Sequence, residues 1–361
     1  MKKDGIFSFL SSIIVIIIGL LIGLLILFLS NAQQAWPAFT TIMTFGFSSM
    51  RSFGDVLLQA TPIILTGLSV AFAFKTGLFN IGASGQFTIG SFIAVYIAVE
   101  FTNLPPAIRI LLAIVLATIG GAIWGAIPGL LKAYRNVHEV ISSIMTNYIA
   151  MFLVNYLIIS SIFDQGRGTS VRLPDSSTLP TLGLGNIFQT GNRSSHINIG
   201  IIIAIIAAIF IYVLLEKTTF GYELKACGFN KDAARYAGIN QNRKIVQSMM
   251  ISGALAGLAG ALNYMGATGL SMSTVDSLAA EGFTGISVAF LGLSHPIGII
   301  FSGALISYLY LGGARMQAFG FSIEIVEVVI SIIIYFCAFV SLIKLFLMKK
   351  ATKYLSTKEE L

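Results

Sequence analysis

The sequence predicts an all-α polytopic membrane protein with about ten transmembrane segments, including broken or half-length helices. Three observations predict this class. Of the 361 residues, 56% are hydrophobic and 10% are charged, whereas soluble domains are about a quarter charged. The mean hydropathy is +0.89. The apolar residues stand in runs of ~20, enough for a helix to cross the bilayer, and the short alternating segments of a β-barrel are not evident.

We expect one transmembrane domain over residues 1–361, with an outer loop at 163–196, an inner loop at 216–244 and a tail at 348–361. The expected spans lie near 8–29, 54–74, 80–99, 108–131, 138–162, 197–215, 245–265, 282–294, 297–313 and 323–347.

Two of these segments are irregular. Segment 282–294 is too short to cross alone, so we expect either a half-helix or a segment joined to its neighbour through a break at His295-Pro296. Segment 80–99 opens with Asn80, Gly82 and Gln86, so its first turns should not face lipid, and interrupted segments of this kind tend to line a cavity. A Gly-broken segment follows a conventional span on each side of residue 197, which suggests a two-half internal pseudo-repeat.

The first span also fits a signal peptide, because Lys2 and Lys3 precede the apolar run and Ser30-Asn31-Ala32 resembles a cleavage site. Its apolar core exceeds the 7–15 residues usual for a signal. We therefore expect an uncleaved anchor.

The charges predict the orientation. With the N-terminus inside, every lysine falls on the cytoplasmic side. The basic residues of the outer segments are all arginines: Arg51, Arg109, Arg167, Arg172, Arg193 and Arg315. Basic residues concentrate in cytoplasmic loops, so both termini are expected in the cytoplasm. The net charge of +7 then reports orientation and does not indicate nucleic-acid binding.

Several functions lack their motifs. The chain has no G-x-x-x-x-G-K-[ST], no strand-linked G-x-G-x-x-G and no H-E-x-x-H. Cys227, Cys337 and the three scattered histidines offer no metal-site spacing. We expect no catalytic residue, no metal and no cofactor in this chain.

Charged and small residues inside the spans have structural explanations. Glu139, Glu324 and Glu327 lie near span ends, where anchoring and helix-dipole pairing are expected rather than a proton pathway. The glycine repeats are typical of close helix packing, and they comprise Gly121, Gly125, Gly129, Gly253 and Gly257.

The inner loop contains a compact polar stretch, FGYELKACGFNKDAARYAGIN, from Phe220 to Asn240. Asn230 is placed to cap a helix beginning at Lys231, and Gly238 is placed to end it. A two-turn helix is too short to be stable alone, so neighbouring helices or a partner should hold it. Its small-residue face (Ala233, Ala234 and Ala237) is expected to admit another protein closely, with Arg235 and Tyr236 adding larger contacts. An ordinary solvated loop is the alternative.

These residues resemble the coupling loop of ABC importer permeases, in the branch that handles branched-chain amino acids, ribose-type sugars and nucleosides. Three further stretches are similar to segments of the same family: TGLFNIGASGQFTIGSF (76–92), HEVISSIMTNYIA (138–150) and GFTGISVAFLGLSHPIG (282–298). The stretch at 138–150 looks like that of the nucleoside subfamily. The resemblance covers residues 55–340 and departs from the family at Ser84, where an acid is common, and at His138, where Asn is common.

The resemblance implies a larger permease subunit that binds no ATP itself. Its implied partners are a cytosolic ABC ATPase carrying ATP and Mg²⁺, a second, homologous permease, a substrate-binding lipoprotein outside, a nucleoside and membrane lipid. The implied contacts with the ATPase are Gly221, Glu223, Ala226, Gly228, Asn230, Ala233, Ala234, Arg235, Tyr236 and Gly238.

For the translocation path we expect Asn80, Gly82, Ser84, Gln86 and Asn147, because uncharged amides in a membrane segment need partners. Interhelical hydrogen bonding is the alternative for each amide. A ribose- or galactose-type sugar permease and an ion-coupled carrier remain the alternative functions, and the transported solute is left open.

Overall fold

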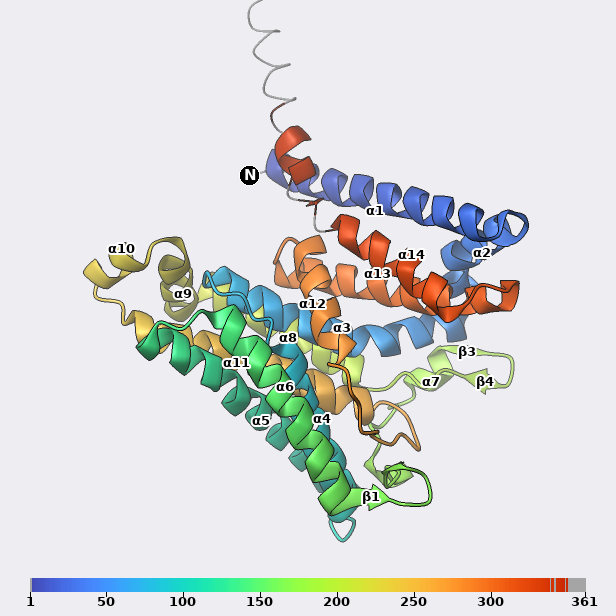
Figure 1. Cartoon of the computed structure of the whole chain (residues 1–361), viewed down its shortest axis with the longest axis horizontal. Coiled ribbons are helices and arrows are strands. Elements are labelled where there is room, and N and C mark those ends of the chain that lie inside the picture. The colour runs from blue at the N-terminus through green and yellow to red at the C-terminus, as the bar shows by residue number, and fades with distance from the viewer. Residues whose placement is uncertain (1, 338, 341, 348, 350–361) are drawn as a thin grey trace, which may run out of the picture.

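The computed structural model describes residues 2–337, 339–340, 342–347 and 349 (Figure 1). Each expected span corresponds to a helix, and together these helices confirm the all-α membrane class. They are α1 (Lys2–Ser30), α3 (Met50–Lys75), α4 (Ala83–Glu100), α5 (Pro106–Arg135), α6 (Glu139–Leu157), α8 (Gly200–Lys217), α11 (Gln241–Tyr264), α12 (Ala280–Leu291), α13 (Pro296–Ala314) and α14 (Ile323–Cys337). Within the described residues, seven helices are long and apolar enough to cross a membrane. The remaining three are α4, which begins with polar residues, and the shorter α12 and α14.

Shorter elements connect the spans. After α1 come α2 (Ala32–Thr44) and a 3-10 turn (Phe45–Phe47), and α6 ends in a π turn (Ile158–Ile162). The inner loop contains α9 (Thr219–Phe229) and α10 (Lys231–Tyr236), and a 3-10 turn (Arg315–Phe319) follows α13.

The outer loop carries small strands that the sequence did not predict. β1 (Phe163–Asp164) pairs with β2 (Thr169–Ser170), and β3 (Gln189–Thr190) pairs with β4 (Arg193–Ser194). A 3-10 turn (Asp175–Ser177) and α7 (Leu184–Ile187) lie between them. Figure 1 shows these strands at one end of the molecule and α9 and α10 at the opposite end.

The centre of the bundle consists of α3, α4 and α11. Most residues in the apolar stretches of α3 and α11 are buried, whereas most residues of α1, α5 and α8 are partly or fully exposed. The exposed positions of α5 include Leu111, Ile119 and Ile123, which suit contact with lipid. This arrangement places α4 inside the bundle, as expected for its polar start.

Glycines allow α5 to approach the central helix α11. A Cβ atom on Gly121 would lie 2.7 Å from the Cα of Gly257, and one on Gly253 would lie 3.0 Å from the Cα of Gly125. Helices in lipid associate through such close packing of small residues. The prediction that these glycines serve packing is confirmed.

The short segment after residue 280 forms a helical hairpin with its neighbour. Leu293 and Ser294 adopt positive φ angles of 53° and 52° in the turn, and Pro296 opens α13 at the first helical position, which favours proline. The half-helix α12 therefore reverses direction before His295 and packs on α13. The segment is thus a half-helix that is also joined to its neighbour through a break at His295-Pro296, so both descriptions expected from the sequence are confirmed.

The two Gly-broken segments meet at the centre. The hydroxyl of Ser84 donates to the carbonyl oxygen of Ala279 at 2.9 Å, and Gly282 packs against the backbone of Ser84. Both α4 and α12 also pack on α3. The internal pseudo-repeat itself remains a prediction.

The acidic residues lie at helix ends, as expected. Glu139 begins α6 and forms a 2.9 Å ion pair with Lys132 at the end of α5. Glu324 lies in the first turn of α14, and Glu327 lies one turn further on; the side chains of both are exposed. The Glu139 contact explains the acid in α6 structurally.

Candidate functional site

The first candidate site is the α9–α10 segment (residues 219–236), which α8 and α11 hold in place. Thr218 caps α9 by accepting a 3.1 Å hydrogen bond from the amide of Gly221. Gly221 lies against the backbone of Leu214, where a Cβ atom would overlap the carbonyl oxygen. Lys244 of α11 pairs with Glu223 and lies 4.3 Å from the ring centre of Phe220. Gly221 and Glu223 therefore fix α9 on the bundle.

Hydrogen bonds from the flanking residues cap both ends of the short helix α10. The side chain of Asn230 accepts hydrogen bonds from the amides of Asp232 and Ala233, both at 3.0 Å. At the other end Gly238 has φ +81°, and the amide of Ile239 donates to the carbonyl of Ala234. The predicted cap and stop are confirmed, and together they define a rigid turn-and-a-half of helix.

The α9–α10 segment exposes aromatic side chains. Phe229 is 91% exposed, Tyr236 is 93% exposed and Tyr222 is 70% exposed. A groove of about 550 Å³ runs between α9 and α10, and Ala226 and Ala233 line it. Because large aromatic side chains outside the lipid are normally covered, this surface is suited to contact with another protein.

The three predicted contact alanines of α10 differ in exposure. Ala233 and Ala237 are exposed, but Ala234 is only 3% exposed. All three alanines line the groove between α9 and α10, so their common small-residue face remains a prediction, with Ala234 at the buried floor of that groove. Arg235 is exposed and lines a second hollow with Asn240 and Asn242.

The end of α9 contacts the turn between α3 and α4. A Cβ atom on Gly228 would lie 2.8 Å from the carbonyl carbon of Thr76 and 2.9 Å from the amide nitrogen of Gly77. The hydroxyl of Thr76 in turn lies 2.6 Å from the hydroxyl of Ser248 on α11. A displacement of α9 would thus reach the end of α3 through backbone contact and α11 through the Thr76 side chain.

The second candidate site is a central polar cluster of Ser69, Asn80, Gln86 and Ser252. The Asn80 amide donates to Gln86 Oε1 at 2.8 Å and to Ser252 Oγ at 2.6 Å. Gln86 donates back to Asn80 Oδ1 at 3.2 Å. Asn80 is fully buried and Gln86 is 1% exposed. In this conformation the two amides bond to each other, and Ser252 connects them to α11 and, through Ser69, to α3.

The other predicted path residues adjoin this cluster. Asn147 of α6 accepts a 2.8 Å hydrogen bond from the amide of Gly85 and donates to the carbonyl of Ile81 at 2.9 Å. Gly82 lies between the two amides of the cluster, since a Cβ atom there would be 3.0 Å from Asn80 Oδ1. Ser84 is fully buried. The structure therefore brings all five residues together and gives the three amides hydrogen bonds within the chain.

The sequence did not single out Phe229, Tyr222 or Lys244. Phe229 directly precedes the cap residue Asn230, and an aromatic residue beside a helix cap in a polar loop is a signal that would have identified it. The serines at 69, 248 and 252 were also missed, because their partners lie 172 or more residues away or in another helix.

The chain matches known permeases over most of its length. Residues 52–338 match the family described as branched-chain amino acid transport system, permease component. The guanosine ABC transporter permease protein NupP of Bacillus subtilis (strain 168) is 39% identical over 90% of this chain and 92% of NupP. The nucleoside ABC transporter permease protein NupB of Lactococcus lactis subsp. cremoris (strain MG1363) is 39% identical over 94% of both chains.

A sugar permease is also similar. The glucose ABC transporter permease protein TsgB13 of Haloferax volcanii is 30% identical over 80% of this chain and 76% of TsgB13. No solved structure matches the chain significantly. The family match and the two 39% identical relatives cover the central helices and the α9–α10 segment alike. The chain therefore belongs to the branched-chain amino acid transport permease family and is a multi-pass membrane subunit of the ABC transporter type.

Proposed function

We propose that this chain is the nucleoside-translocating subunit of an ATP-driven importer and that its α9–α10 segment receives motion from a separate cytosolic ATPase. The nucleoside class rests on the two relatives at 39% identity. The glucose relative, at 30% identity, makes a sugar the alternative solute.

The exposed, self-capped α10 carries the coupling proposal. An isolated helix of six residues would not persist in water, yet Asn230 and the turn at Gly238 satisfy its ends. A helix that is held rigidly and still exposes Tyr236 is suited to insertion into a groove of another protein. The residues that we propose for this contact include Ala226, Ala233, Arg235 and Tyr236, together with Phe229.

Transmission would follow the contact of Gly228 with the α3–α4 turn. The turn leads within a few residues to the central polar cluster, which bonds α3, α4 and α11 to one another. Backbone-to-backbone contact lacks side chains that could absorb a displacement. Motion of α10 would thus be delivered to the three helices at the centre of the bundle.

We propose that the translocation path, in another conformation of the protein, is lined by Asn80, Gly82, Ser84, Gln86 and Asn147. Separation of α4 from α6 and α11 would release their amide groups to a neutral, hydrogen-bonding solute. A nucleoside offers such groups on its base and ribose. In the present conformation the same groups keep the helices together.

The remaining partners follow from the family. ATP and Mg²⁺ would bind to the ATPase, a homologous second permease would complete the path, and an outer lipoprotein would deliver the nucleoside. The distribution of the lysines supports a plasma-membrane orientation in which both termini and the α9–α10 segment are cytoplasmic.

The test is uptake of radiolabelled guanosine by proteoliposomes containing this chain, its ATPase, the second permease and the receptor. We expect ATP-dependent uptake of guanosine, and we expect that excess ribose or glucose does not inhibit it. Uptake by the complex without ATP, driven by an ion gradient, would reject the importer. Inhibition by sugar with no nucleoside uptake would favour the sugar alternative.

A double variant tests the docking surface in the same assay. Phe229→Ser with Tyr236→Ser should reduce co-purification of the ATPase and uptake at least 10-fold, in the range of hot-spot aromatics. Leu182→Ser is the matched control, because Leu182 is 74% exposed in the outer loop. Unchanged ATPase binding by the double variant would remove the α9–α10 segment from the interface.

A further inference from the structure

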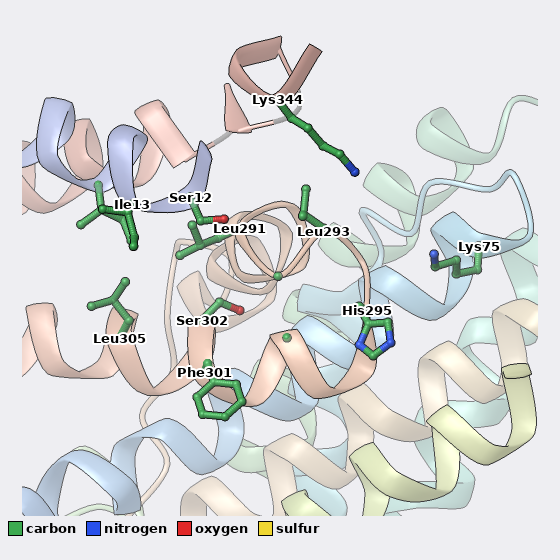
Figure 2. A pocket seen from close by; sticks show the side chains of 13 residues that line it. Ser12, Ile13, Lys75, Leu291, Leu293, His295, Phe301, Ser302, Leu305 and Lys344 are labelled. Carbon is green, nitrogen blue, oxygen red and sulfur yellow. The ribbon is translucent and has the colours of Figure 1, made fainter. Parts of the chain in front are cut away.

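A cavity of about 710 Å³ lies between α1, the α12–α13 hairpin and the stretch after α14 (Figure 2). It is separate from the central polar cluster and from the groove of the α9–α10 segment. Its volume falls within the 300–1,000 Å³ of small-molecule sites. The proposed transport function assigns it no role.

The two ends of this cavity differ in character. Figure 2 shows Lys75, His295 and Lys344 at one end and Ile13, Phe301 and Leu305 at the other. No acidic side chain lines it within the described residues. The cavity therefore combines an apolar body with a basic rim.

The lysines of the rim have no counter-ion in the part of the chain that the structure describes. Glu216, which lies close enough to act on His295, pairs instead with Lys225 at 2.9 Å. Lys75 and Lys344 are only partly exposed. Two half-buried lysines at one end of an apolar cavity favour the binding of a negatively charged group there.

The basic rim lies at the end of α3, close to the α9–α10 segment. Lys75 is the last residue of α3, and Leu293 belongs to the hairpin turn. These two residues also line a neighbouring cavity with Gly228 and Phe229 of the α9–α10 segment. The rim is thus on the side that we propose to be cytoplasmic, where the leaflet is rich in anionic lipid.

We propose that this cavity binds one anionic glycerophospholipid, whose phosphate contacts Lys75 and Lys344 and whose acyl chain lies along Ile13, Phe301 and Leu305. A nucleoside is neutral and polar, so it would leave both the lysines and the apolar body unmatched. Free phosphate would match only the rim. A phospholipid matches both, and its headgroup would lie beside the end of α9.

Native mass spectrometry of the purified full chain, titrated with dioleoyl phosphatidylglycerol or dioleoyl phosphatidylcholine, tests this site. Phosphatidylglycerol should bind preferentially. The double variant Lys75→Gln, Lys344→Gln should weaken its binding about 10- to 30-fold, as expected for loss of two cations at a membrane surface. The control double variant Arg135→Gln, Lys349→Gln removes the same charge outside the cavity and should bind normally.

A second pair tests the apolar end. Ile13→Trp should reduce lipid binding by filling the cavity, whereas Ile17→Trp, one turn along α1, should not. Equal binding of the two lipids, or equal loss in both double variants, would overturn the proposal. So would displacement of phosphatidylglycerol by millimolar inorganic phosphate, since the acyl chain would then contribute nothing.

Discussion

Gly228 and Gly77 bring the inner loop and the central bundle into backbone contact. A Cβ atom on Gly228 would lie 2.9 Å from the amide nitrogen of Gly77, a separation that real Cβ atoms do not reach. No side chain intervenes between α9 and the α3–α4 turn at this point. In our proposal this contact transmits motion from the ATPase.

The variant Gly228→Ala should therefore uncouple transport. The added methyl group must push α9 away from the turn, at a cost of about 1–3 kcal/mol for overpacking. We expect uptake to fall at least 10-fold while the ATPase still co-purifies with the chain. Gly166→Ala is the control, because the nearest atom to a Cβ there is a flexible Asp164 oxygen at 3.3 Å. Wild-type uptake by Gly228→Ala would exclude this contact from transmission.

Adjacent alanines of α10 provide a matched pair for the docking surface. Both line the groove, but Ala233 is exposed whereas Ala234 is only 3% exposed. Ala233→Trp should block ATPase binding with little effect on the thermal stability of the chain. Ala234→Trp should instead disrupt α10 itself, which accelerated proteolysis at residues 230–240 would report. If Ala233→Trp leaves both ATPase binding and uptake at wild-type levels, the groove is not the docking surface.

The central polar cluster should stabilise the bundle. Asn80→Leu removes both hydrogen bonds of the buried Gln86 amide, and an unsatisfied buried group costs about 1–3 kcal/mol. We expect the thermal unfolding midpoint in detergent to fall by several degrees. Asn186→Leu, an exposed position of the outer loop, is the control. An unchanged midpoint for Asn80→Leu would show that these hydrogen bonds do not hold the helices together.

The features that sequence reasoning identified are local ones. The spans follow from hydropathy, and the ends of α10 follow from Asn230 and Gly238, whose roles depend on neighbours within a few residues. The orientation of Ala234 was not predictable in this way. The phase of so short a helix depends on what it packs against, and α9 was not expected as a separate helix.

The same distinction applies to the polar cluster. The sequence indicated that Asn80 and Gln86 need partners, but Ser252 lies 172 residues from Asn80, and no periodicity connects them. The basic-rimmed cavity was missed for a similar reason. Lys75 ends α3, His295 precedes α13 and Lys344 follows α14, and only the tertiary fold brings the three together.

The hairpin turn gives a pH-dependent prediction. Partial desolvation and the ammonium group of Lys75 lower the pKa of His295 below its ordinary value of 6.5, with Glu216 acting in the opposite sense. Between the lowered pKa and about 6.5, the unfolded chain binds a proton that the folded chain does not. The free energy of unfolding should therefore rise with pH through this window and level off above it.

His295→Gln should remove this part of the pH dependence, measured as the difference in unfolding midpoint between pH 5.5 and pH 7.5. His196→Gln, an exposed position of the outer loop, is the control and should retain it. Lys75→Gln should reduce the dependence without abolishing it, because burial, the larger cause of the shift, remains. A dependence that persists unchanged in His295→Gln would show that another group titrates in this range.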